Sequence, residues 1–201
     1  MSGPPRWPKG PFPEKYRGRA VHERLAGAWE SEPAREALGA TLALGLAPHP
    51  RHDDPYVKLF ASARRDALEA LRALPGVSAF AWCFGTRDDV VTEEDGPLVG
   101  LVPTAHPVEA LVLVGVAGPA HGIGSAALAR FFTTLRSFAS YRIEAMGEER
   151  IEASITPRDA AAALLIADRM RHVCPPLARA HAEPAPIAAE LVAGRLVMDF
   201  R

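Results

Sequence analysis

The spacing of apolar residues changes once along this chain, and this change constrains the fold more than any single motif. Before Pro75-Gly76, apolar side chains recur at the intervals of an amphipathic helix. After it they form short continuous runs, at 77–84, 98–102 and 110–116, which are typical of strands covered on both faces. This order predicts an α+β fold, with a mixed, mostly antiparallel sheet of about five to six strands, packed with helices and preceded by a helical segment.

The helical region covers residues 20–76, and its residue pattern predicts three helices. The first begins near Arg19, and the second follows an N-cap at Ser31. The third follows Asp54 and carries an apolar stripe from Phe60 to Leu74. Inward-facing residues of the second helix are expected at Leu38 and Leu42. The outer, solvated face of the third helix is expected to carry Arg64, Arg65, Glu69 and Arg72.

Residues 77–201 are predicted to form the α+β domain, and residues 20–201 are expected to pack as one unit. Its strands include the three apolar runs, and an amphipathic helix spans Leu128 to Phe138. The remaining elements are a hairpin (142–145 and 150–155), a helix capped by Thr156 with Ala160, Ala163, Leu164, Ala167 and Met170 inside, a short helix (187–192) and a strand (196–200).

Composition excludes several classes of function. The 201 residues carry a formal net charge of −1, which favours neither nucleic acid nor acidic membranes as partners. The longest apolar stretch is too short to span a bilayer. The two cysteines, Cys83 and Cys174, are too few for a disulfide framework and sit among apolar neighbours, so buried free thiols are expected. These features predict a protein of the reducing cytoplasm.

Residues 1–19 form a Pro-rich, basic segment that is expected to be extended. Two interpretations stay open. The segment either lies over its own domain, with Trp7 and Phe12 as anchors, or acts as an arm that grips a partner through Arg6, Trp7, Phe12 and Tyr16.

The segment Gly118–Ser125 connects an apolar run to the most amphipathic helix. Gly122 and Gly124 allow close approach of a ligand, and the helix that begins at Ser125 offers free backbone amides to an anion. The stretch resembles the strand–turn–helix element that holds the coenzyme A pyrophosphate in GNAT acetyltransferases. That resemblance implies acyl-CoA as a cofactor, with His121, Gly122, Gly124 and Ser125 at the ligand and His121 or Glu109 available for proton transfer.

Two clusters that contain histidines are candidate metal sites. One contains His49, His52, Asp53 and Asp54, and the other contains His172, Cys174 and His181. Neither has the spacing of a recognised ligand set, so no metal is expected.

From Pro97 to the C-terminus the order of elements resembles the bacterial domain-of-unknown-function family 4253. The similarity rests on Val102-Pro103 through Pro107 and Glu109, on the Gly-rich turn before a helix, on Tyr141 entering a hairpin, and on Thr156-Pro157 leading to Cys174-Pro175. It covers about half of the chain. Members of that family look like small accessory or immunity-type proteins, which implies binding rather than catalysis.

These observations lead to three hypotheses of function. The first is a protein-interaction module that binds a partner protein, needs no cofactor and performs no catalysis. The second is a GNAT-like, acyl-CoA-dependent acyltransferase. The third is a structural subunit of a larger assembly, docked through residues 1–19.

Overall fold

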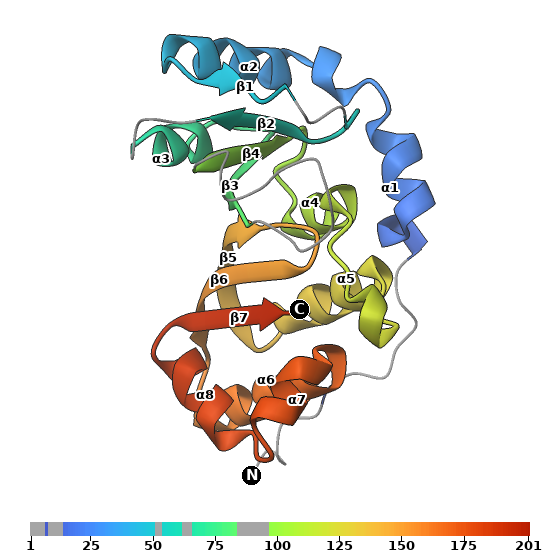
Figure 1. Cartoon of the computed structure of the whole chain (residues 1–201), viewed down its shortest axis with the longest axis vertical. Helices are drawn as coiled ribbons and strands as arrows, with labels where there is room; N and C mark the ends of the chain where they lie inside the picture. Colours follow the sequence, from blue (N-terminus) through green and yellow to red (C-terminus); the bar gives the residue numbers. More distant parts are fainter. Residues whose placement is uncertain (1–6, 8–13, 51–53, 62–65, 84–96) are drawn as a thin grey trace.

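In the computed structural model, helices pack around a single mixed β-sheet (Figure 1). The α+β class expected from the sequence is confirmed, although the sheet has more strands than the five to six expected. The structure describes residues 7, 14–50, 54–61, 66–83 and 97–201.

Seven strands of the described residues form the sheet, in the order β1-β2-β4-β3-β5-β6-β7. Every neighbouring pair is antiparallel except β3 and β5, which run parallel. The strands are β1 (Ala47–Pro48), β2 (Lys58–Ala61), β3 (Ser78–Trp82), β4 (Leu98–Val102), β5 (Ala139–Met146), β6 (Arg150–Pro157) and β7 (Arg195–Asp199).

Eight α-helices and three short 3₁₀ helices accompany these strands in the described part of the chain. The α-helices are α1 (Gly18–Leu25), α2 (Glu32–Ala43), α3 (Ala67–Arg72), α4 (Pro107–Val114), α5 (Ser125–Leu135), α6 (Ala160–Val173), α7 (Pro175–Ala180) and α8 (Ala185–Val192). The 3₁₀ helices are η1 (Glu14–Tyr16), η2 (Ala28–Glu30) and η4 (Pro119–His121).

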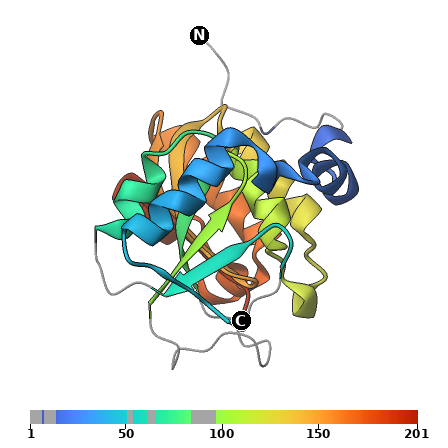
Figure 2. The same cartoon turned by 90° about the horizontal axis from the view of Figure 1, so that it is seen from above.

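The part of the sheet formed by β2, β4 and β3 is covered on both faces, whereas both residues of the edge strand β1 are exposed. Phe60, Val99 and Leu101 pack with α2 and α3 in one hydrophobic cluster, and Figure 2 shows α2 lying across these strands. The alternate residues Leu59 and Leu98 point to the opposite face and join the main core around α4. All five residues of β4 are buried, so its continuous apolar run reflects a strand with helices on either side.

The half formed by β5, β6 and β7 is covered on one face. Its inward residues, such as Ile151, Ile155 and Met198, join the main core with α5, α6 and α8. The outward residues include a ladder of paired charges, in which Arg150 contacts both Glu152 and Asp199. Helices therefore cover one face of the sheet along its whole width. They cover the other face only over β2, β4 and β3.

The apolar run 110–116, which was expected to be a strand, lies mostly in the helix α4, so that prediction was wrong. Six of the eight residues of α4 are buried, because the helix packs between the sheet and α1 and α5. A helix surrounded in this way is apolar all round and loses the periodic stripe that marks a surface helix. Pro107 begins the helix and Gly115 ends it with a φ of 73°.

The helix expected to follow Asp54 is also not formed. Asp54 Oδ1 accepts hydrogen bonds from the backbone N–H groups of Tyr56 and Val57, both at 2.7 Å, in a turn that leads into β2. The helical spacing holds only for the later residues, which form α3. The region 20–76 therefore contributes two strands to the sheet as well as helices.

Smaller corrections concern the ends and faces of helices. Leu42 and Leu164 are exposed, although both were expected to face inward. Thr156 lies in β6, and the cap of α6 is Asp159, which accepts from the N–H of Ala162 at 2.7 Å. No helix among the described residues is long and apolar enough to cross a bilayer.

Gly100 of β4 packs directly against Phe80 of β3, whereas Gly39 of α2 has free space around it. Substitution by alanine should therefore have opposite effects at these two glycines. A Cβ at Gly100 would lie 2.3 Å from Cε2 of Phe80, whereas a Cβ at Gly39, inside α2, meets nothing within 4 Å. We expect Gly100→Ala to lower the free energy of unfolding by about 1–3 kcal/mol, and Gly39→Ala to raise it by about 0.5–1 kcal/mol. Urea denaturation measures both, and a neutral Gly100→Ala would contradict this packing.

Candidate binding site

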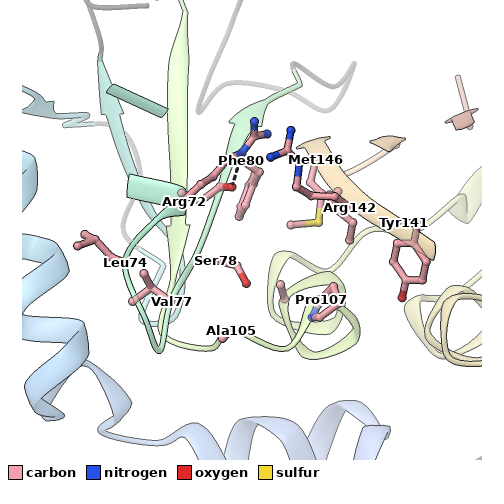
Figure 3. Close-up of a pocket in the computed structure, with 13 residues that line it drawn as sticks. Arg72, Leu74, Val77, Ser78, Phe80, Ala105, Pro107, Tyr141, Arg142 and Met146 are labelled. Atoms are coloured by element: carbon pink, nitrogen blue, oxygen red, sulfur yellow. Dashed lines mark hydrogen bonds between the residues drawn. The ribbon is translucent and has the colours of Figure 1, made fainter. Parts of the chain in front are cut away.

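The sheet departs from a regular ladder between β3 and β5, where a cavity lies. The two strands pair at only two positions, Ala81 with Ala145 and Trp82 with Met146. Towards their amino-terminal ends they diverge, and a cavity of about 310 Å³ occupies the gap (Figure 3). We call it the β3–β5 cleft. Its lining residues are Arg72, Leu74, Val77, Ser78, Ala79, Phe80, Ala105, Pro107, Ala110, Tyr141, Arg142, Ile143 and Met146.

Arg72, the last residue of α3, bridges the two diverging strands at one end of the cleft. Its Nε donates to the carbonyl of Ala79 in β3 at 3.3 Å, and its Nη2 donates to the carbonyl of Glu144 in β5 at 2.7 Å. Nη1 lies 2.8 Å from Oε2 of Glu144, and the Arg72 side chain is only 12% exposed. Glu144 occupies a bulge where the β5–β6 register shifts. The guanidinium therefore replaces the backbone hydrogen bonds that the diverging strands cannot make.

The carboxylate of Glu144 stays ionised in this setting. Burial alone would raise its pKa, but hydrogen bonds from Ser154 and Arg142 and the charge of Arg72 outweigh burial and lower the pKa. Arg142 also pairs with Glu144 at 2.8 Å, and Glu69 of α3 lies at ion-pair distance from both arginines. Two carboxylates thus compensate two guanidinium groups at this end of the cleft.

The two hydroxyl groups that line the cleft are engaged as donors as well. Ser78 Oγ donates to the carbonyl of Thr104 at 2.6 Å, and Tyr141 Oη donates to the carbonyl of Phe132 at 3.1 Å. Burial raises the pKa of Tyr141 above its usual value, so the phenol is neutral. The remaining lining residues are mostly apolar. The cleft is therefore suited to a neutral, mainly apolar group.

A polar cluster lies beside the cleft, at the start of α4. Thr104 Oγ1 donates to Glu109 Oε2 at 2.7 Å and accepts from the backbone N–H of His106 at 3.1 Å. Arg24 of α1 binds the other oxygen of Glu109 at 2.6 Å. Tyr16 Oη lies 3.0 Å from Nε2 of His106. The cluster fastens η1 and α1 to the first turn of α4, and its residues Thr104, His106 and Glu109 belong to the stretch that carried the family resemblance.

His106 is held in its neutral form. Burial lowers its pKa, and the nearby charge of Arg136 lowers it further, while Glu109 acts in the opposite sense. Nη1 of Arg136 lies 3.5 Å from Nε2. The other ring nitrogen, Nδ1, is buried and has no hydrogen-bond partner among the described residues. Because a guanidinium can only donate, Nε2 is the acceptor in this contact, and a proton added to Nε2 would face the charge of Arg136.

The Gly-rich turn does not sit in the strand–turn–helix setting that its resemblance to acetyltransferases requires. The helix α4 precedes it, and η4 lies within it. Gly118 is packed against the last aromatic residue, since a Cβ there would lie 2.6 Å from Cδ1 of Phe200. Gly122 has a φ of 68°, which favours glycine in a tight turn. Both glycines therefore have architectural roles.

The other predicted residues of this turn lie at the surface. His121 is the last residue of η4 and is half-buried. Gly124 is the exposed N-cap of α5, and Ser125 begins that helix. Among the described contacts, no hydrogen bond joins His121 to Glu109, whose oxygens bind Arg24 and Thr104.

Two residues of the N-terminal segment contact its own domain. Trp7 stacks on Phe131 and Phe138, with ring centroids 5.4 and 5.3 Å apart. Tyr16 is buried against His106. These contacts favour the interpretation of a segment that lies over the domain. Arg6 and Phe12, the other two residues of the expected arm, lie outside the described residues.

The histidine clusters do not converge in the described part of the chain, where no group of three or more metal-ligating side chains is found. His172 Nδ1 donates to the carbonyl of Asp168 at 2.7 Å, and the Cys174 thiol donates to the carbonyl of Asp199 at 3.4 Å. His52 and Asp53 lie outside the described residues. Both cysteines are free, and burial raises the pKa of each thiol to about 11.

Sequence reasoning missed the cleft and misassigned Arg72 to a solvated face. Arg72 and its partner Glu144 are 72 positions apart, and no local pattern links them. The nearest signal was the Pro75-Gly76 break, which turns the chain from α3 into β3 and so places Arg72 beside that strand.

Comparisons with protein-family models, curated proteins and solved structures found no match for this chain. The resemblance to the bacterial family described above therefore stays an expectation.

The bridging role of Arg72 predicts a large loss of stability when the guanidinium is removed. We expect Arg72→Met to lower the free energy of unfolding by about 2 kcal/mol or more, because Glu144 loses the more buried of its two guanidinium partners and two carbonyls lose donors. Arg142→Met is the matched control. Its side chain is 60% exposed, so the expected loss is within about 1 kcal/mol. Urea denaturation that ranks the two variants equally would contradict the bridge.

The neutral state of His106 predicts a loss of stability in mild acid. Because the folded-state pKa lies below the unfolded one, the unfolded chain binds the proton more tightly once the pH falls below about 6.5. The groups facing the ring are Tyr16, Arg136, Glu109, Lys15 and Arg24. His106→Gln removes the titration, so the stability difference between wild type and variant should shrink as the pH falls from 8 to 5.5. Parallel pH profiles would contradict this prediction.

Proposed function

We propose that this protein is an interaction module without catalytic chemistry, which accepts an apolar side chain of a partner protein in the β3–β5 cleft. The observation that carries the proposal is the state of the polar groups that line it. Arg72, Ser78 and Tyr141 each donate to a backbone carbonyl of the fold. Groups committed to holding the fold are poorly placed to move protons or attack a substrate, whereas they can border an apolar binding pocket.

The size of the cleft supports a side chain as the occupant. Pockets for small molecules span about 300–1,000 Å³, and the cleft, at about 310 Å³, lies at the lower limit. It is large enough to admit one apolar side chain. Anchor residues of protein partners bind in well-packed pockets of this kind and supply much of the binding free energy.

Two further points agree with this function. The resemblance to family 4253 implies a small accessory or immunity-type protein that binds a partner. The free thiols of Cys83 and Cys174 suit a partner met in the reducing cytoplasm.

The test uses capped amino-acid amides as mimics of the anchor residue. N-acetyl-leucinamide and N-acetyl-phenylalaninamide should shift the backbone amide signals of Ser78 and Ile143 saturably in ¹H–¹⁵N NMR spectra, and N-acetyl-serinamide should not. Ala105→Phe places a ring at the mouth of the cleft and should abolish these shifts, because Ala105 lines the cleft and is exposed. Ala126→Phe, at an exposed position of α5, is the matched control.

Two results would overturn the proposal. One is the absence of saturable shifts with any apolar amide. The other is binding that Ala105→Phe leaves unchanged, which would place the apolar ligand elsewhere.

A further inference from the structure

A second hollow, of about 510 Å³, lies where α5 ends and β5 begins. It is lined by Arg136, Ser137, Ala139, Ser140, Tyr141 and Arg158. Arg136 follows the last residue of α5, and Arg158 directly follows β6. We call this site the arginine hollow. Tyr141 is the one residue that it shares with the lining of the β3–β5 cleft.

The two arginines of this hollow differ from the paired arginines elsewhere on the surface. Arg72, Arg142 and Arg150 each contact at least one carboxylate. Within the described part of the chain, neither Arg136 nor Arg158 has a carboxylate at ion-pair distance. The hollow therefore carries two positive charges that the described carboxylates do not neutralise.

The contacts that the two arginines do make leave most of their donors unused. Arg136 contacts the neutral ring of His106 at 3.5 Å and also hydrogen-bonds to the hydroxyl of Tyr141. Arg158 donates to the carbonyl of Ser137 and lies 6.0 Å from the centre of the Phe138 ring. Each guanidinium has five N–H donors. Some of these N–H donors cap carbonyl groups at the end of α5. Such capping does not require two arginines in one hollow.

The nearest carboxylate of the neighbouring cluster is committed elsewhere. Glu109 binds Arg24 with one oxygen at 2.6 Å and Thr104 with the other at 2.7 Å. The lowered pKa of His106, to which Arg136 contributes, agrees with a positive potential here that is not cancelled.

We propose that the arginine hollow is a binding site for an oxyanion, a phosphate or a carboxylate group, held by the guanidinium groups of Arg136 and Arg158. Guanidinium groups bind both kinds of anion through two parallel N–H···O bonds, and such charge-assisted bonds are stronger than neutral ones. The hydroxyls of Ser137 and Ser140 add donors to the same wall. This site does not depend on the proposed function of the cleft.

The experiment titrates the protein with single anions and follows ¹H–¹⁵N NMR shifts at constant ionic strength and pH 7.5. One arm uses inorganic phosphate and the other uses acetate, with sodium chloride as the reference salt. Saturable shifts of the Ser137 and Ser140 amides with either anion are the expected result. Tighter binding of phosphate would identify a phosphorylated ligand as the source, and tighter binding of acetate would identify an acidic side chain or a chain terminus.

Variants locate the anion. Arg136→Gln and Arg158→Gln should each raise the dissociation constant about tenfold or more. Arg195→Gln removes an exposed arginine paired with Glu190 at 3.4 Å and should leave it unchanged. Bound anion should also raise the pKa of His106 in wild type, which is read from the imidazole signals independently of stability.

The failure of this site and the failure of the cleft are distinguishable. Ala105→Phe closes the cleft and not the arginine hollow, so anion binding should survive in that variant. Equal effects of phosphate, acetate and chloride, or equal dissociation constants in wild type, Arg136→Gln and Arg158→Gln, would overturn the proposal.

Discussion

The guanidinium of Arg72 joins two halves of a sheet that backbone hydrogen bonds alone join at only two residue pairs. It donates to a carbonyl on each strand and pairs with Glu144, which lies where the β5–β6 register shifts. Because the strands diverge beyond this bridge, a cavity remains between them. A continuous ladder would have brought the strands about 4.8 Å apart and left no such space. The joint between the halves and the proposed binding site therefore have the same cause.

Charged side chains pair with one another on the uncovered face of the sheet, but two arginines at the end of α5 have no such carboxylate partners among the described residues. On the uncovered face of β5 to β7, charged side chains pair with one another across strands, as Arg150 does with Asp199. Such partly exposed pairs contribute little to stability, but each brings opposite charges together on this face. At the end of α5, by contrast, Arg136 and Arg158 lie together in one hollow. A net charge of −1 for the whole chain conceals this local excess.

Local patterns predicted the elements whose burial is one-sided. The stripe of α5, the hairpin of β5 and β6, and the strand β7 each alternate between core and solvent, so their periodicity is visible. Elements covered on every side were harder to assign. The runs that became β4 and α4 are both continuously apolar, and only the flanking residues Pro107 and Gly115 distinguish the helix. The candidate sites were harder still, because each depends on residues brought together from distant segments.

The sequence by itself determined the α+β class, the mostly antiparallel sheet and most of its strands and helices. These depend on the spacing of apolar residues, on capping residues and on glycine or proline breaks, all of which act over a few positions. Only the tertiary structure decided where β3 and β5 separate, that Arg72 bridges them, and that Arg136 and Arg158 share a hollow. Such contacts join residues far apart in the chain, and their geometry follows from how the packed layers fit together.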